Sequence, residues 1–439
     1  MSNVKALIVA VVSKLPSGNK IPFHPVDERG NSLDVVVKES ASFLSEEDFL
    51  KDEKFEVSKV VFLSSTLSFT LRDPPPDYAS LEGQLKEKAK EFFGDTRSFV
   101  LPSSGVFVSN GVVHDHREGI SNYELFLYLN LYKTLMEEVP DLVVLDVSLA
   151  SSVESLASSR ATELAVYDFA STKKKEVEVM QVASPPCFAE NEEVKLYATK
   201  REVVRKVDLA DFFTKEIKLV KQAGEKGINA TGKSDIYGVG KAIQYGLPLA
   251  LLYLVKEAKL ENFVKEEELE RKIRESIKVN KSEKLYLVEA GLEAHENSIY
   301  YYMGYHFIQN YKKLAEGEEF DVDRILEVSE LMGEGRRVVI NAELKRIKEL
   351  ASLLEKETEV SLDYLLKLGE MKVSDWLRKR KVEEETECEF DKVRMVSHAG
   401  FERRSTVVKV KEGKILLKYR EECVEEIING VKNLDKEES

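Results

Sequence analysis

The sequence predicts an α/β domain with a mostly parallel sheet, followed by a mainly α-helical domain that carries a small β-hairpin. Three observations lead to this expectation. The chain of 439 residues exceeds the size of one ordinary hydrophobic core. Strand-like runs alternate with helical segments over roughly the first 190 residues, and helical periodicity dominates from about residue 200 to 399.

Short runs rich in β-branched residues alternate with helical segments in the first part of the chain. This alternation predicts a parallel sheet that helices cover on both faces. Ser80 and Asn122 are placed to cap the two helical segments. A further run, Leu164–Phe169, is expected to pair antiparallel with Val177–Val182. The other expected strands are Val4–Val12, Lys59–Leu63, Ser98–Leu101 and Leu142–Val147, and the expected helices are Ser80–Phe93 and Asn122–Glu138.

A Ser-Pro-Pro sequence at residues 184–186 and an acidic stretch after it predict a domain boundary near residue 190. We expect a sheet domain at residues 1–190, a linker with a connecting helix at 191–235, and a helical domain at 236–439. A hairpin is expected around Lys411-Glu412-Gly413, with a closing helix from Glu421. The segments with a helical period are Ile236–Lys259, Glu283–Lys313, Val322–Leu331 and Arg337–Glu355, and the hairpin strands are Thr406–Val410 and Lys414–Tyr419.

The composition argues against several classes of protein. With 65 basic and 79 acidic side chains the formal charge is -14, which disfavours a surface that coats nucleic acid but allows a local basic patch. Cys187, Cys388 and Cys423 form no CxxC pair, so neither a disulfide framework nor a structural zinc site is predicted, and a reducing cytoplasm is the expected location. The longest apolar run, Tyr245–Val255, is well below membrane-spanning length, so no membrane insertion is expected.

Three segments follow predicted strands and are expected at the carboxyl-end edge of the sheet, where open parallel sheets bind ligands. The last of them is rich in hydroxyl groups at a strand-to-helix turn, which suits a phosphate or a ribose. A simple helix N-cap cluster explains it equally well. No GxGxxG or P-loop pattern is present, so neither a dinucleotide site nor a P-loop is predicted. The segments are Ser13–Lys20, Leu101–Gly111 and Asp146–Ser152.

The sequence His114-Asp115-His116, with Glu118 after it, has the residue types of a metal site. The two histidines can reach one ion from a loop, but the sequence offers no third ligand. A solvated loop or a ligand lid is therefore the favoured interpretation, and a metal-dependent hydrolase is its rival.

Arg394 and His398 carry the most suggestive chemistry in the chain. On a helix the two side chains lie one turn apart on one face. A histidine can take the proton of a ribose 2′-hydroxyl or protonate the leaving oxygen, and a guanidinium can stabilise charge on the phosphate. Lys392, Arg403, Arg404 and the basic run at residues 378–381 surround the pair with positive charge, as a polyanion site requires.

A structural explanation of the same residues stays open. His398 can stabilise the end of a helix that Gly400 caps, with the arginines on a solvated face. One Arg and one His at helical spacing often occur by chance, so on these residues alone the structural explanation is favoured.

Over nearly its whole length the sequence resembles the CRISPR-associated ribonucleases of type III systems that join a CARF domain to a HEPN domain. The resemblance is carried by the Leu145-Asp146-Val147-Ser148 turn, by the strand ending Val182-Ala183-Ser184-Pro185-Pro186, and by His398-Ala399-Gly400-Phe401-Glu402 before the hairpin. It implies a Rossmann-like CARF domain that binds a cyclic oligoadenylate. It also implies a helical HEPN domain that cleaves single-stranded RNA through an Arg and a His separated by four to six residues.

The resemblance implies a metal-independent endoribonuclease of antiviral defence, with no cofactor and with cyclic tetra-adenylate as the expected activator. It also implies a homodimer or higher oligomer, because a ring with rotational symmetry matches two identical domains around a two-fold axis. The implied catalytic residues are Arg394, His398, Lys392 and Ser397, and the implied ligand-binding residues are Ser13, Lys14, Gly105, Asp146, Ser148, Ala150, Ser151 and Ser152.

Two departures from the family pattern keep alternatives open. Only three residues separate Arg394 from His398, which suggests a catalytically weak or inactive sensor of the cyclic oligoadenylate. The family's Asp-x-Thr-His-Gly-x-Asn turn is reduced here to residues 146–152, which changes the expected ligand contacts. A ring nuclease that degrades the messenger in its CARF domain is the other alternative.

Overall fold

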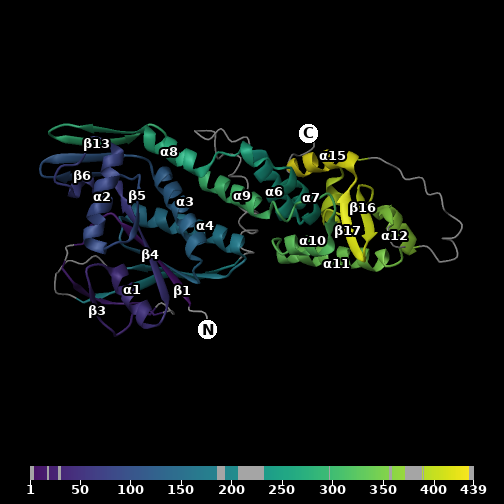
Figure 1. Ribbon diagram of the computed structural model, residues 1–439, viewed down its shortest axis with the longest axis horizontal. Coiled ribbons are helices and arrows are strands. Elements are labelled where there is room, and N and C mark those ends of the chain that lie inside the picture. The colour runs from purple at the N-terminus through teal and green to yellow at the C-terminus, as the bar shows by residue number, and fades with distance from the viewer. Residues whose placement is uncertain are drawn as a thin grey trace. The chain divides into compact units, whose positions relative to one another are not determined.

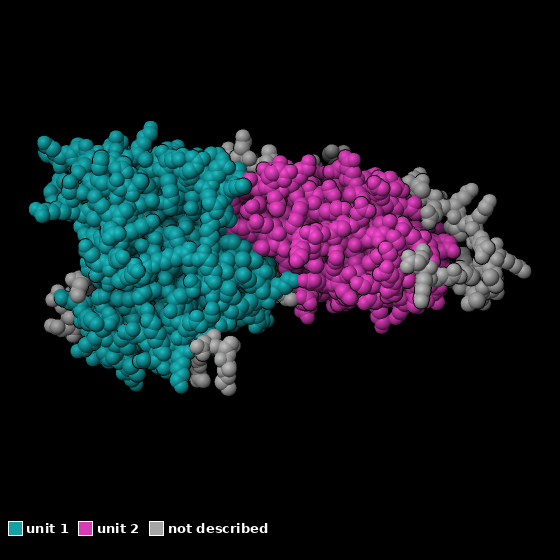
Figure 2. Space-filling model, in the orientation of Figure 1, with its two compact units in different colours: residues 1–205, 224–229, 264–299 teal, residues 206–223, 230–263, 300–439 magenta. Residues whose placement is uncertain are grey.

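The computed structural model describes residues 4–16, 19–27, 31–184, 193–205, 232–295, 297–354, 358–370, 388 and 390–434. These residues form two compact units, coloured separately in Figure 2. The first unit contains the described residues up to 205 together with residues 264–299. The second contains residues 232–263 and the described residues from 300 onward.

A six-stranded sheet forms the centre of the first unit, with the strand order β11-β9-β8-β1-β4-β5 (Figure 1). Five of its strands are parallel, and β11 pairs antiparallel with β9 at one edge. In the central strand β1, every residue after Lys5 is buried, as expected for a strand covered on both faces. The strands are β1 (Lys5–Val12), β4 (Glu56–Ser64), β5 (Arg97–Leu101), β8 (Leu142–Leu149), β9 (Val177–Ala183) and β11 (Tyr197–Val204). The predicted, mostly parallel sheet is confirmed.

Helices cover both faces of this sheet. Ile8 and its alternate neighbours in β1 pack in one core with Phe43 and Leu81, which belong to α1 and α2. Side chains alternate along a strand, so Val9 faces the opposite side, where α3 and α4 contact the sheet and each other. The expected N-caps are wrong: Asp77, and not Ser80, caps α2, and the N-cap residue of α3 is Gly119, with Asn122 inside the helix. The helices are α1 (Ser42–Asp52), α2 (Tyr78–Phe93), α3 (Ile120–Glu138) and α4 (Ser152–Lys173).

The expected strand at Leu164–Phe169 is wrong, because these residues lie within the long helix α4. Ala157, Ala161 and Ala165 recur at helical spacing and are buried, and α4 packs against α3. The apolar run was mistaken for a strand because its length fits both structures. The true antiparallel partner of β9 is β11.

Two smaller sheets complete the first unit. In one of them, β13 pairs parallel to β7, and this pairing draws residues 264–299 into the first unit although the sequence placed them in the helical domain. The sheets have the orders β10-β2-β3 and β12-β13-β7-β6. Their strands are β2 (Ile21–His24), β3 (Val37–Glu39), β6 (Ser104–Ser109), β7 (Val112–Arg117), β10 (Val194–Lys195), β12 (Ile277–Lys281) and β13 (Leu285–Ala290), with the 3-10 helix η1 (Ser65–Thr70) and α8 (Glu266–Ser276) beside them.

The second unit is mainly helical and contains the predicted hairpin, which is confirmed together with the closing helix. Gly246, at φ 71, divides the expected helix at 236–259 into α6 and α7. The hairpin belongs to a four-stranded sheet with the order β14-β17-β16-β15. The elements are α6 (Lys233–Tyr245), α7 (Pro248–Glu257), η2 (Leu260–Asn262), α9 (Ser298–Tyr311), β14 (Phe320–Asp321), α10 (Val322–Ser329), α11 (Glu334–Ala351), β15 (Glu359–Ser361), α12 (Leu362–Glu370), α14 (Lys392–Ser397), β16 (Thr406–Lys411), β17 (Lys414–Tyr419) and α15 (Glu421–Lys432).

The helical expectation was incomplete for residues 283–313, which contain the strand β13 as well as α9. Among the described helices, none combines the length and the apolar character that crossing a bilayer requires.

Candidate active site

The carboxyl ends of β1 and β8 bring two of the expected messenger-binding segments together. The backbone N–H groups of Ser13 and Lys14 both donate to the carbonyl oxygen of Leu149, at 2.9 and 3.2 Å. The Ser13 hydroxyl donates to the same oxygen at 3.1 Å. Ser13 is buried and Lys14 is exposed, so this edge of the sheet presents an ammonium group to solvent beside the start of α4.

The hydroxyl groups of the second segment have structural partners of their own. The Ser148 hydroxyl accepts a hydrogen bond from the Ser184 N–H at 2.9 Å. Ser151 caps α4, since its hydroxyl accepts from the Glu154 N–H at 3.3 Å and donates to the Glu154 carboxylate at 2.6 Å. Ser151 is therefore the N-cap residue of α4, which is the structural interpretation that the sequence left open for this segment. Ala150 is half-buried and Ser152 is exposed at the first turn of the 22-residue helix α4, whose N-terminus favours an anion.

Asp146 lies beneath this loop and is buried. One oxygen of its carboxylate accepts the Ser148 N–H at 2.7 Å, which shapes the turn at the end of β8. Burial raises the pKa of Asp146. The structure thus places Asp146 in a supporting position under the loop, with its carboxylate away from solvent.

A second buried carboxylate, Glu46 of α1, lies near Asp146. Glu46 accepts the Val26 N–H at 2.9 Å. Burial, with a smaller contribution from Asp146, raises the pKa of Glu46 to about 8. The folded first unit therefore holds a proton on Glu46 that the unfolded chain releases at a lower pH.

The stability of the first unit is expected to fall as pH rises from about 4.5 towards about 8, because folding then requires Glu46 to keep its proton. Glu46→Gln keeps the acceptor for Val26 and removes this titration, so the variant gains stability over the wild type as pH rises through that window. Urea unfolding between pH 5 and pH 9 measures the difference. Glu53→Gln, at an exposed carboxylate just after α1, is the control and should keep the wild-type slope. Parallel pH profiles for wild type and Glu46→Gln would contradict the assignment.

Gly105 lies in a different sheet, in β6. A side chain there would meet the Phe107 ring at 2.8 Å and approach the Thr66 methyl group at 3.6 Å. The structure therefore gives Gly105 a packing role beneath Phe107, and its expected contact with a ligand stays a prediction.

The His114-Asp115-His116 segment forms the strand β7, so the solvated loop or lid expected from the sequence is wrong. β7 pairs with β6 on one side and β13 on the other, which turns both histidines inward. His116 Nδ1 lies 2.9 Å from the Glu118 carboxylate, and its Nε2 lies 2.8 Å from the Ser68 hydroxyl. Ser65 donates to the same Glu118 oxygen at 2.6 Å.

These buried groups form one hydrogen-bonded chain that ties η1 to β7. If Glu118 accepts the proton on His116 Nδ1, then Nε2 accepts from Ser68, whose oxygen can accept from His114 Nδ1 at 3.1 Å. Burial, followed by the neighbouring His116, lowers the pKa of His114. Within the described part of the chain, no cluster of three His, Cys, Asp or Glu side chains has the arrangement of a metal site.

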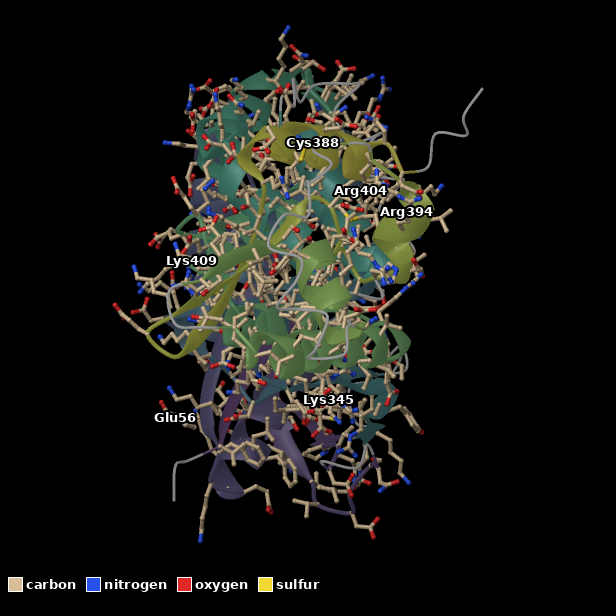
Figure 3. The ribbon with its side chains drawn as sticks, turned by 90° about the vertical axis from the view of Figure 1, so that its right-hand side faces the viewer. Glu56, Lys345, Cys388, Arg394, Arg404 and Lys409 are labelled. Carbon is tan, nitrogen blue, oxygen red and sulfur yellow. A yellow bond between two sulfur atoms is a disulfide. The ribbon has the colours of Figure 1, made fainter. Side chains whose placement is uncertain are left out.

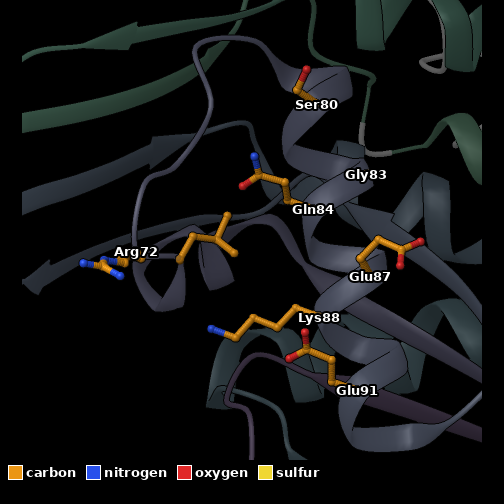
Figure 4. A pocket seen from close by; sticks show the side chains of 8 residues that line it. Arg72, Ser80, Gly83, Gln84, Glu87, Lys88 and Glu91 are labelled. Carbon is orange, nitrogen blue, oxygen red and sulfur yellow. The ribbon is translucent and has the colours of Figure 1, made fainter.

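A cavity of about 610 Å³ lies between the end of η1 and the outer face of α2 (Figure 4). Leu71 and Arg72 line one side, and Lys88 crosses it to donate to the Thr70 carbonyl oxygen. Its remaining lining comes from α2. None of the residues expected to bind the messenger lines this cavity.

In the second unit, the short helix α14 carries the expected catalytic pair. The Asp391 carboxylate caps this helix by accepting the Arg394 N–H at 2.9 Å. α14 ends at Ser397, and His398 is its C-cap residue, with its own N–H donating to the Arg394 carbonyl oxygen at 3.1 Å. The one-turn separation of Arg394 and His398 is thus present.

His398 has a partner that the sequence did not indicate. Its Nδ1 atom lies 3.0 Å from the carboxylate of Glu343, which belongs to α11. The His398 side chain is 28% exposed and that of Glu343 is 18% exposed. The imidazole is therefore held from one side and open on another.

Arg394 lies at the surface of the second unit (Figure 3). Its guanidinium lies 3.2 Å from the Asp391 carboxylate, and its side chain is 58% exposed. Such an exposed ion pair is weak, so the guanidinium can exchange Asp391 for a phosphate. Lys392 donates to the Leu434 carbonyl oxygen, and the exposed Ser397 hydroxyl donates to the Arg394 carbonyl oxygen at 3.2 Å.

The turn after His398 is fixed by backbone conformation. Gly400 has φ 81 and lies so close to the main chain of Leu247 that an added side chain would meet its Cα at 3.3 Å. The Tyr419 hydroxyl donates to the Gly400 carbonyl oxygen at 2.7 Å, and the buried Glu402 carboxylate accepts the N–H groups of Arg404 and Ser405 at 2.8 and 2.7 Å. The C-cap residue is thus His398 and not Gly400, but Gly400 closes the helix end by donating its N–H to the Met395 carbonyl oxygen at 2.8 Å.

Cys388 and Cys423 form a disulfide, so the absence of disulfides expected from the sequence is wrong. The two residues are 35 positions apart, and no short motif signals the pair, because the fold alone brings α15 against the chain that enters α14. The Phe390 N–H also donates to the carboxylate of Glu426 in α15 at 3.0 Å, which adds a second link between α15 and the chain before α14. Cys187, the run 378–381 and residues 185–192 with the expected boundary lie outside the described residues.

Removing the disulfide is expected to lower the free energy of unfolding of the second unit by about 3 kcal/mol, because the crosslink restricts a loop of this length in the unfolded chain. Cys423→Ser compared with wild type in denaturant titrations measures the loss. Cys187→Ser controls for the loss of a thiol. Equal stability of Cys423→Ser and wild type under oxidising conditions would show that the bond does not stabilise this unit.

Two protein-family models match the chain. "CRISPR system endoribonuclease Csx1, CARF domain" matches residues 7–186, and "CRISPR system endoribonuclease Csx1, HEPN domain" matches residues 333–421. Together they cover more than half of the chain. The chain belongs to the CARF–HEPN family of CRISPR-associated proteins. The first unit therefore contains the CARF domain and the second the HEPN domain.

A solved structure with some likeness to this CARF–HEPN chain is "Enterococcus italicus Csm6 bound to cyclic hexa-2'-fluoro-hexa-dAMP". It is 8% identical, with 80% of this chain and 86% of that chain covered, and the TM-score is 0.24. No curated protein matches the chain. The HEPN match includes Glu343, Arg394 and His398.

Proposed function

We propose that this CARF–HEPN protein is an endoribonuclease that cleaves single-stranded RNA at His398, without a metal ion, when a cyclic oligoadenylate binds its CARF unit. One observation carries the proposal. A partly exposed imidazole is held through Nδ1 by Glu343, with the exposed cation Arg394 one helical turn away. Side chains alone can then supply acid–base catalysis and charge stabilisation.

The chemistry follows from the two side chains. His398 takes the proton of the ribose 2′-hydroxyl as its oxygen bonds to the adjacent phosphorus, and the bond from phosphorus to the 5′-oxygen breaks. The leaving oxygen receives a proton, from the same imidazole or from that of a second protomer. Arg394 releases Asp391 and binds the phosphate, whose negative charge it stabilises. Lys392 and Ser397 support this helix through their backbone hydrogen bonds.

We place the activator at the loops that meet at Leu149 in the CARF unit. There Lys14, Ser148, Ala150, Ser151 and Ser152 combine an ammonium, hydroxyl groups and the N-terminus of α4, all of which suit phosphate and ribose. We expect a homodimer, whose two-fold axis matches a cyclic tetra-adenylate ring and joins two HEPN units. The ligand then shifts the equilibrium between two arrangements of the dimer by its differential affinity for them.

The test of this function is RNA cleavage in the presence of cyclic adenylates. A labelled single-stranded RNA is incubated with the protein and cyclic tetra-adenylate, cyclic hexa-adenylate or linear tetra-adenylate. We expect one of the rings to stimulate cleavage and the linear form to be inactive. Binding of a ring without cleavage under any condition would instead support an inactive sensor, the alternative that the three-residue spacing between Arg394 and His398 favours.

Lys14→Ala is expected to weaken binding of the active ring by about tenfold, because one charge-assisted contact to a phosphate is lost. Calorimetric titration of the ring measures the change. Lys38→Ala, at an exposed lysine of β3, is the matched control and should bind like wild type. Equal weakening by both variants would show that Lys14 acts only through net charge.

A further inference from the structure

A carboxylate from a different helix faces the histidine of the proposed active site. Glu343 belongs to α11, 55 residues before His398, and contacts Nδ1 at 3.0 Å. Its helix turns Ile340, Leu344 and Ile347 into the core, so the backbone that carries Glu343 is anchored by buried neighbours. The contact is thus built from two separately fixed elements.

This contact selects the form of the imidazole. A carboxylate accepts, so Nδ1 carries the proton, and in a neutral ring Nε2 is then free to accept one. Among the described residues, Nε2 of His398 bonds to no protein group. The free nitrogen is the one that can reach a substrate, since the Glu343 side of the ring is occupied.

We propose that Glu343 is a positioning residue for RNA cleavage, which holds His398 with its proton on Nδ1 and directs Nε2 to the ribose 2′-hydroxyl. This inference rests on the proposed ribonuclease function. Glu343 does not touch the RNA. It acts through His398, first by fixing the ring and then by stabilising the imidazolium that forms when Nε2 takes a proton.

Two substitutions separate the charge of Glu343 from its hydrogen bond. Glu343→Gln keeps an oxygen that can accept from Nδ1 but removes the negative charge. Glu343→Ala removes both. The matched control is Glu349→Gln, on the same helix, where the carboxylate is 67% exposed and lies 4.0 Å from Lys345. We expect kcat to fall in the order wild type, Glu343→Gln, Glu343→Ala, by about 10- to 100-fold in the last, with KM unchanged.

A double-mutant cycle and a spectroscopic measurement distinguish positioning from a general structural effect. In a His398→Ala background, Glu343→Ala should cause no further loss of the residual activity, because its effect passes through the imidazole. Nitrogen-15 NMR of labelled histidine should show His398 with the proton on Nδ1 in the wild type and in Glu349→Gln. Glu343→Ala should convert it to a mixture of tautomers.

The outcomes separate this inference from the function on which it rests. If the wild type cleaves RNA and Glu343→Ala keeps the wild-type kcat, the positioning role is overturned while the ribonuclease stands. An unchanged tautomer in Glu343→Ala would overturn it as well. If the wild type cleaves no RNA with any ring, the proposed function fails, and the NMR measurement alone still decides whether Glu343 sets the state of His398.

Discussion

Replacement of His398 by alanine is expected to lower ring-stimulated RNA cleavage by about a thousandfold, the range lost when a general acid–base group is removed. His398 is partly exposed at the end of α14, so the substitution creates no core cavity. The loss should appear in kcat, measured with labelled RNA at saturating cyclic oligoadenylate. Binding of the ring to the CARF unit, measured by calorimetry, should be unchanged.

A matched control for this variant is His295→Ala. His295 is also partly exposed, and its Nδ1 accepts the Asn297 N–H at 3.2 Å in the other unit. It should keep wild-type cleavage. A His398→Ala variant that cuts RNA at the wild-type rate would exclude His398 from the chemistry, whatever its contact with Glu343.

Glu118→Ala is expected to destabilise the CARF unit by about 4 kcal/mol, the largest stability change we predict. The carboxylate is fully buried and accepts hydrogen bonds from Ser65 and His116, and both lose this acceptor in the variant. The removed side chain also leaves a cavity. Thermal and urea unfolding of the full chain should show the loss as an earlier transition.

The control for this substitution is Glu289→Ala, at an exposed position of β13, the strand that pairs with β7. Its effect should stay within about 0.5 kcal/mol, as for surface positions in general. Equal stability of Glu118→Ala and Glu289→Ala would show that the buried chain of serines and histidines does not hold η1 on β7.

The parts of the fold that sequence periodicity predicted are those with one clear pattern. The central strands are continuous apolar runs, and the hairpin at 406–419 has a two-residue turn with a glycine, so both were predictable. Leu164–Phe169 was mistaken because a mostly apolar run of six residues fits a strand or a buried helix. β7 was not predicted because His114 and His116 are polar, and their burial depends on hydrogen bonds to Ser68 and Glu118 that the sequence does not reveal.

The sequence predicted only those parts of the candidate site whose residues lie close together along the chain. Arg394 and His398 are close in sequence, so helical spacing alone placed them together. Glu343 was missed because it lies 55 residues away on another helix, and a lone Glu on a charged helix gives no signal. The disulfide between Cys388 and Cys423 was missed for the same cause, since only tertiary structure brings the two thiols together.

The ends of the RNA fragments test the central claim most directly. If His398 activates the neighbouring 2′-hydroxyl, cleavage with the active ring and excess EDTA must leave a 2′,3′-cyclic phosphate on one fragment and a 5′-hydroxyl on the other. Mass spectrometry of the products measures this. A strand of the same sequence in which every sugar is 2′-deoxyribose has no 2′-hydroxyl and should remain intact. Fragments with 5′-phosphate and 3′-hydroxyl ends, or cleavage that EDTA abolishes, would contradict the account.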